Sequence, residues 1–189
     1  ETPLIEMAQR LKISIARGPE EDVLERFLIA ADQVKAQHIV RICGDNPLID
    51  RQLIRSLIHT HLKENTDYTI TSDSIPLGTG TEVVKVKALK NIAETTTEPK
   101  YREHVTTWFH DNPTLVSQSH VPAPAYLMNK SHRLTVDTRN DLTLMEKIFD
   151  EFYSLASPLL DLEKVIQFLD ARPDISQINA DTPQKNWRS

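Results

Sequence analysis

The stretch His38 to Asp50, HIVRICGDNPLID, decides what kind of fold this chain adopts. Residues 39–43 are too apolar for a half-solvated strand and predict a buried one, which Gly44-Asp45-Asn46-Pro47 then ends. A strand that ends in Gly-Asp delivers a carboxylate to the carboxyl edge of a sheet, and ligands of open α/β sheets bind outside that edge. Asp45 is therefore the first candidate functional residue.

Composition sets the class of protein. A chain of 189 residues, with 39% hydrophobic and 26% charged residues, is typical of one soluble globular domain, which we place at residues 1–189. A net charge of −5 argues against a general nucleic-acid binder and favours a small partner. The single cysteine, Cys43, excludes an internal disulfide and fits a reducing compartment. With no apolar run of about 20 residues and no signal-peptide pattern, a cytoplasmic protein that does not enter the membrane is expected.

Hydrophobic periodicity predicts helices alternating with short strands, the pattern of α/β folds. Helices are expected at residues 2–11, 19–31, 51–64, 88–95, 101–113, 139–152 and 161–171. Strands are expected at residues 13–16, 39–43, 67–71, 81–87 and 134–136. The irregular stretch 115–127 should form edge strands or leave the main sheet, because prolines interrupt it. Residues 115–130 are also a candidate homodimer surface, although a solvated excursion explains them equally well.

A second aspartate, Asp137, repeats the setting of Asp45. It ends the predicted strand 134–136, and Thr138 and Asp141 form a capping box for the helix that follows. If the two strands are neighbours, both carboxylates meet at one edge and offer oxygen ligands to Mg²⁺, which usually takes one or two carboxylates plus substrate phosphates. The alternative is that both aspartates are caps or turn residues, since aspartate is favoured in both places.

Strand 81–87 and the loop before it hold further candidates. Glu82 shares a strand face with two valines, so it lies either at a solvated strand start or in a polar pocket. The loop contains two of the four glycines, Gly78 and Gly80, which either approach a ligand or belong to an ordinary surface loop.

Three of the four histidines in the predicted helices are candidates for a functional role. His59 and His61 fall off the apolar stripe of helix 51–64, so both are expected on its solvated face. His104 lies on the apolar stripe of helix 101–113, where a core histidine explains it without a catalytic role.

Four segments together resemble the cytidylyltransferase family, which includes acylneuraminate synthetases and the spore-coat polysaccharide biosynthesis F proteins. They are RGPEEDVLERF at 17–27, VRICGDNPLID at 40–50, YREHVT at 101–106 and RLTVDTRNDL at 133–142. The resemblance implies a nucleotide-diphospho-sugar-transferase fold, with a mixed, mostly parallel sheet flanked by helices. It also implies that a sugar-acid hydroxyl attacks the α-phosphate of CTP, giving a CMP-sugar and pyrophosphate for cell-surface polysaccharide.

The resemblance assigns roles to single residues. Asp45 matches the metal-binding aspartate of the family and Asp137 its second acidic position, so Mg²⁺ is the implied cofactor between two catalytic carboxylates. Arg102 and His104 fall in a motif near the sugar-acid pocket. The weaker candidates for nucleotide contacts are Arg17, Arg41 and Gly44.

Two departures from the family pattern matter. Residues 78–82 read Gly-Thr-Gly-Thr-Glu where the family has Gly-Leu-Asp-Val-Glu, which puts the sugar contacts expected of Gly80 and Glu82 in doubt. The basic glycine-containing loop that cradles the triphosphate in the family has no counterpart, so we expect a chain that lacks the first β-α-β portion and has little activity. The alternatives are a related glycosyltransferase that uses Asp45 and a divalent metal, or a non-catalytic binding module of the same fold.

Overall fold

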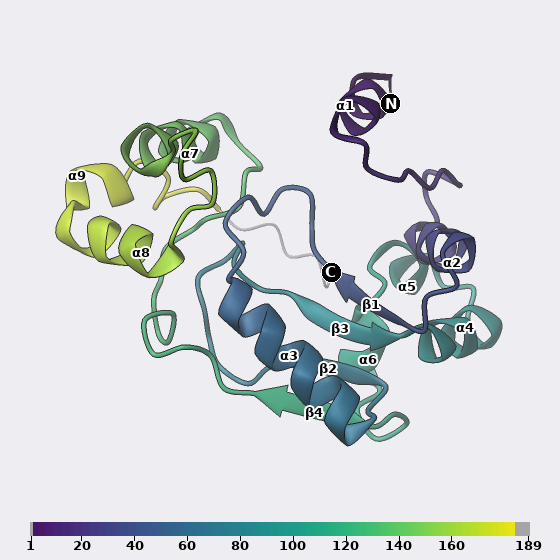
Figure 1. The fold of residues 1–189 in the computed structure, drawn as a ribbon. Coiled ribbons are helices and arrows are strands. Elements are labelled where there is room, and N and C mark those ends of the chain that lie inside the picture. Colours follow the sequence, from purple (N-terminus) through teal and green to yellow (C-terminus); the bar gives the residue numbers. More distant parts are fainter. Residues whose placement is uncertain (1, 184–189) are drawn as a thin grey trace.

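A four-stranded open sheet organises the computed structural model, which describes residues 2–183 (Figure 1). The strands are β1 (His38–Arg41), β2 (Tyr68–Thr71), β3 (Glu82–Lys85) and β4 (Gln118–Val121), in the order β1-β3-β2-β4. β3 pairs antiparallel with β1 and β2, whereas β2 and β4 are parallel. The expected mixed α/β sheet is confirmed, but only one of the three pairings between these described strands is parallel. The ends of the expected domain 1–189 lie outside the described residues.

Helices cover both faces of this sheet and build a second body beside it (Figure 1). The helices are α1 (Thr2–Leu11), α2 (Val23–Gln33), α3 (Arg51–Glu64), α4 (Val86–Thr95), α5 (Pro99–Glu103), α6 (Thr107–Asp111), α7 (Arg139–Phe152), α8 (Leu162–Ala171) and α9 (Pro173–Ser176). Of these, α1 buries no residue and lies apart from both bodies. Among residues 2–183, no helix has the length and apolar character that crossing a membrane requires.

The two-residue period of the strands decides which helix packs on which face. In β3, Val83 packs with Leu53 and Leu57 of α3. Its neighbour Val84 points to the opposite face, into a cluster built with α2, α4 and α6. Both faces are therefore covered. The expected fully buried strand at 39–43 is wrong, however, because β1 lies at the sheet edge, its residues are half-buried and Ile42 is exposed.

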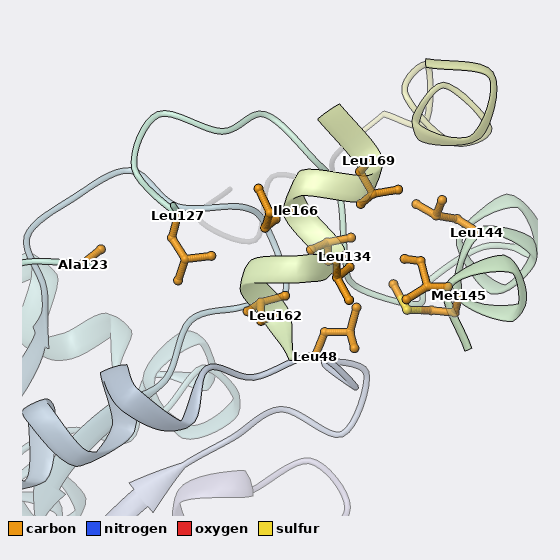
Figure 2. Packing of buried hydrophobic residues seen from close by; sticks show 11 residues of the cluster. Leu48, Ala123, Leu127, Leu134, Leu144, Met145, Leu162, Ile166 and Leu169 are labelled. Atoms are coloured by element: carbon orange, nitrogen blue, oxygen red, sulfur yellow. The ribbon is translucent and has the colours of Figure 1, made fainter. Parts of the chain in front are cut away.

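A separate hydrophobic cluster holds α7 and α8 together (Figure 2). Leu144, Met145 and Ile148 come from α7, and α8 contributes four buried residues from Leu162 to Leu169. The chain after β1 adds Leu48, and the segment between β4 and α7 adds Ala123, Leu127 and Leu134. The turn that contains Asp45 thus leads from the sheet to this second cluster.

Local sequence signals locate several helices to within a residue. The expected helices 2–11, 51–64, 139–152 and 161–171 are confirmed as α1, α3, α7 and α8. Asp50 caps α3 by accepting from the backbone N–H of Leu53 at 2.6 Å. Thr138 and Asp141 form the predicted capping box of α7. β4 lies at the sheet edge, as the interrupted sequence around it predicts.

Three predicted elements are wrong. Residues 13–16 form no strand, because no neighbouring strand pairs with them and both isoleucines are exposed. The expected helix 101–113 is two short helices, α5 and α6, since His104, with φ −101° and ψ 72°, leaves the helical conformation. Residues 134–136 belong to no strand, although Arg133 forms an isolated parallel bridge with Leu77.

Candidate functional site

The segments that carry Asp45 and Asp137 lie side by side. The backbone N–H of Val136 donates to the carbonyl oxygen of Asp45 at 2.9 Å, and the hydroxyl of Thr135 donates to the same oxygen at 3.4 Å. Both aspartates are exposed. Two carboxylates that lie 92 positions apart in the sequence therefore come from neighbouring backbone segments, next to the end of β1.

Asp141 anchors the segment that presents Asp137. It is fully buried and accepts hydrogen bonds from Arg133 Nε at 2.8 Å and from Asn179 at 2.7 Å. The backbone N–H groups of Asp137 and Thr138 also donate to it, at 3.1 and 2.9 Å. Burial alone would raise the pKa of this carboxyl, but these hydrogen bonds hold its pKa well below the usual range. Asp141 is thus an anion that fixes the backbone around Asp137.

The chemistry of the two exposed aspartates fits Mg²⁺. Asp137 forms an ion pair with Arg133 at 2.6 Å, but Arg133 keeps its buried partner Asp141 when Asp137 binds something else. No group of three or more histidine, cysteine, aspartate or glutamate side chains that could hold a metal occurs within residues 2–183. Two carboxylates without a third are what a magnesium ion needs when the substrate phosphates supply further oxygen ligands.

Arg41 and Glu82 form a cross-strand ion pair at the same end of the sheet. They are register partners of β1 and β3, and Arg41 donates to Glu82 Oε2 at 2.8 Å. Tyr68 donates its hydroxyl to Glu82 Oε1 at 2.5 Å, so both carboxylate oxygens are occupied. Glu82 therefore lies in a polar pocket, one of the two positions that the sequence left open, and not at a frayed strand start.

Arg102 is held by an acidic partner on α2. Its Nε donates to Asp22 at 2.8 Å and a second guanidinium nitrogen donates to the same carboxylate oxygen. Asp22 is also the N-cap of α2, accepting from the backbone of Glu25 at 2.9 Å. His104 is half-buried at the C-terminal end of α5, where its backbone carbonyl accepts from Thr107. The structure thus gives Arg102 a bridging position between α5 and α2.

The glycines differ in what surrounds them. Gly78 has a positive φ of 91°, and a Cβ there would lie 2.4 Å from the backbone of Leu134. Its close neighbour is therefore the protein's own chain. The nearest atom to a Cβ at Gly80 would be Ile75 Cδ1 at 3.8 Å, and a Cβ at Gly44 would meet nothing within 4 Å. Arg17 is exposed on the segment between α1 and α2.

One histidine lies where the sequence analysis did not place it. His61 was expected on the solvated face of α3, but it is fully buried. Its Nδ1 lies 2.9 Å from Thr69 Oγ1 and its Nε2 lies 3.0 Å from His38 Nδ1. The spacing of Leu53, Leu57 and His61, four residues apart on one helix face, is the signal that could have found it.

Sequence comparison decides the family. The sequence pattern of the family described as cytidylyltransferase matches residues 4–173. The chain belongs to the cytidylyltransferase family. An uncharacterized protein of Methanocaldococcus jannaschii is 36% identical to this chain over 185 residues. The matched residues are 98% of this chain and 74% of that protein.

Two further proteins are similar to this chain, one in sequence and one in fold. The spore coat polysaccharide biosynthesis protein SpsF of Bacillus subtilis is 32% identical to this cytidylyltransferase family member over 161 residues, 85% of this chain and 66% of SpsF. A solved cytidylyltransferase structure from Leptospira borgpetersenii superposes with a TM-score of 0.85 at 22% identity, covering 98% of this chain and 76% of that one. The Methanocaldococcus jannaschii relative supports family membership, and the solved structure supports the fold.

Proposed function

We propose that this protein transfers CMP from CTP to a hydroxyl group of a sugar acid and releases pyrophosphate. The observation that carries the proposal is the contact between the Asp45 and Val136 backbones, which sets the segments of two exposed aspartates side by side in a member of the cytidylyltransferase family. In the reaction, the acceptor oxygen bonds to the α-phosphorus, the bond to pyrophosphate breaks, and the hydroxyl proton passes to solvent.

Asp45 and Asp137 would hold the metal. Bound Mg²⁺ would neutralise charge on the triphosphate and orient the α-phosphoryl group. Arg133 supports this role because it can release Asp137 and still pair with Asp141.

For the acceptor, we propose contacts from Arg102 and His104. A guanidinium binds a carboxylate through parallel N–H donors, and Arg102 binds a carboxylate of this protein, Asp22, through two of its nitrogens. The acceptor's carboxylate would replace Asp22. The name of the Bacillus subtilis relative supports a product destined for a cell-surface polysaccharide.

The test combines turnover with metal binding. Pyrophosphate release is measured with CTP, Mg²⁺ and a panel of sugar acids, and the CMP-sugar is identified by mass spectrometry, with ATP, GTP and UTP as controls. Because the sequence contains no basic glycine loop of the family type, turnover is expected to be weak. Mn²⁺ affinity in the presence of CTP is therefore measured as well, in the wild type, Asp45→Asn and Asp137→Asn.

The outcomes separate the candidate functions. We expect release that requires both CTP and acceptor, and Mn²⁺ binding that weakens in both variants. Transfer from a nucleotide-sugar would favour the glycosyltransferase alternative. A protein that binds neither CTP nor Mn²⁺ would overturn the proposal and leave a non-catalytic binding module.

A further inference from the structure

Arg41 and Glu82, which form an ion pair, differ in exposure and in how many of their hydrogen-bonding groups are used. The Glu82 side chain is 12% exposed and both its oxygens accept hydrogen bonds within the protein, from Arg41 and from Tyr68. The Arg41 side chain is 25% exposed. Its bond to Glu82 uses one of five N–H donors of the guanidinium and the Cys43 side chain is a second partner, so donors remain for a ligand.

Glu82 is fixed by rigid neighbours. Tyr68, which donates to it, is fully buried and stacks on Phe109 with ring centroids 4.6 Å apart and planes 6° apart. His110 Nε2 lies 3.1 Å from the Tyr68 hydroxyl and 3.8 Å from Glu82 Oε1.

The same neighbours keep Glu82 ionised. Burial would raise the pKa of this carboxyl, but His110, Arg41, Tyr68 and Thr106 together hold its pKa below the usual value. Glu82 is therefore an anion at neutral pH whose hydrogen bonds are already made inside the protein. Such a group can orient a neighbour, but it has no free oxygen to offer a ligand.

Arg41 lies close to the proposed metal site in the chain. It is the last residue of β1, four residues before Asp45, and the backbone between them turns once. The Arg41–Glu82 pair carries no net charge, so its free N–H donors suit an uncharged oxygen better than a phosphate. A base carbonyl and a sugar hydroxyl are such oxygens.

We propose that Glu82 is a positioning residue that fixes the guanidinium of Arg41, and that Arg41 donates to an uncharged oxygen of the nucleoside part of the nucleotide. This inference rests on the proposed function and deepens it, because it separates the contacts to the nucleoside from the metal-bound phosphates. Glu82 itself does not touch the nucleotide.

Three variants test the proposal. Glu82→Gln keeps the side-chain shape and removes the charge, and Arg41→Lys keeps the charge and removes the planar donor group. Ile92→Ala in α4 is the control, because it destabilises the hydrophobic cluster under the same sheet face and changes no charge. The affinities for CTP and for pyrophosphate are measured by calorimetry, and the order parameter of the Arg41 Nε–H bond by NMR relaxation.

We expect the Arg41 order parameter to fall in Glu82→Gln and to stay unchanged in Ile92→Ala. Glu82→Gln and Arg41→Lys should each weaken CTP binding about tenfold and leave pyrophosphate binding unchanged. The double variant should bind CTP as well as the single variant with the lower affinity, because the two residues act as one unit. Ile92→Ala should bind both ligands like the wild type.

Three results would overturn the proposal. An unchanged Arg41 order parameter in Glu82→Gln would show that Glu82 does not position the guanidinium. Additive losses in the double variant would show that Glu82 contacts the nucleotide itself, and an equal loss of pyrophosphate affinity in Arg41→Lys would place Arg41 on the phosphates. A wild type that binds no CTP overturns the proposed function and the nucleotide contact with it, while the order parameter still decides whether Glu82 positions Arg41.

Discussion

Asp137 and Asp141 share one cation, the guanidinium of Arg133, which lies 2.6 Å from the first carboxylate and 2.8 Å from the second. Asp141 is fully buried, whereas Asp137 is exposed. The buried carboxylate therefore holds the arginine in place, and the exposed one is available to exchange its partner.

The exposed carboxylates should matter for activity and little for stability. Asp45→Asn and Asp137→Asn should each lower the CTP-dependent turnover by about 10²- to 10³-fold, since each removes a proposed metal ligand. The melting temperature should change little, because surface ion pairs stabilise weakly. Asp170→Asn, which breaks an exposed ion pair with Lys130, is the control and should leave turnover unchanged. Wild-type turnover in either aspartate variant at saturating Mg²⁺ would contradict the metal-binding role and support the alternative that both aspartates are caps or turn residues.

The buried carboxylate should show the opposite pattern. Asp141→Asn leaves the guanidinium of Arg133 without its buried partner and weakens the capping box of α7. We expect a loss of about 3 kcal/mol in the free energy of unfolding, because the buried ion pair is broken and Arg133 keeps only its exposed partner Asp137. Urea unfolding of Asp141→Asn and Asp137→Asn side by side measures the difference. Equal and small losses would contradict the anchoring role of Asp141.

The two loop glycines form a matched pair. Gly78→Ala combines a positive φ of 91° with a Cβ 2.4 Å from the Leu134 backbone, so the variant should lose several kcal/mol or fail to fold. Gly80→Ala adds a methyl group at 3.8 Å from its nearest neighbour and should unfold like the wild type. Thermal unfolding of both variants is the measurement, and a stable Gly78→Ala would show that the Leu134 segment can move away.

His61 should make stability depend on pH. Burial first, and then the positive charge of His38 and of Lys85, lower the pKa of His61 from 6.5 to about 4, against the opposing effect of Asp67. Between these values the unfolded chain binds a proton that the folded protein excludes. The stabilisation is therefore complete above pH 6.5 and is lost as the pH falls towards 4, by on the order of 3 kcal/mol.

Urea unfolding between pH 7.5 and 4.5 measures this dependence. Carboxylates titrate in the same range, so the comparison is with His61→Gln, in which the pH slope should be smaller than in the wild type. His59→Gln is the control, because His59 is exposed on the same helix, and it should keep the full slope. Identical slopes in all three proteins would show that folding does not lower the pKa of His61.

Arg102 can be tested against its own partner. Arg102→Lys and Asp22→Asn both break the contact between α5 and α2, so both should lower stability by about 1 kcal/mol. Only Arg102→Lys should also raise KM for the sugar acid, with KM for CTP nearly unchanged, if the acceptor's carboxylate replaces Asp22. Equal KM values in the two variants would leave Arg102 with a structural role alone. His104→Phe should change stability and neither KM.

The elements with local signals could be predicted from the sequence, and those that depend on distant partners could not. The capping box at Thr138 and the cap at Asp50 fix where two helices begin, because the cap and its backbone donors lie within three residues. The segment 13–16 has a strand-like sequence, but a strand also needs a neighbour in the sheet, and hydrophobicity does not reveal one.

The candidate site divides in the same way. A strand end followed by Gly-Asp pointed to Asp45, and its contact with the segment of Asp137 was left open until the structure showed it. The partners that fix the site, Asn179 for Asp141 and Tyr68 for Glu82, come from 38 and 14 residues away and carry no local pattern. The metal-binding and substrate-binding roles themselves stay predictions.

Asp45 and Asp137 are carried by different elements of the fold. The first follows a strand of the sheet, and the second precedes α7, whose buried residues belong to the cluster of Figure 2. Ile75 is half-buried and packs against both that cluster and the one between α3 and the sheet. A direct bond between the Val136 and Asp45 backbones joins the two segments, and Ile75 packs where the two clusters meet. A change in side-chain volume at Ile75 should therefore shift the segments against each other and alter the proposed metal affinity.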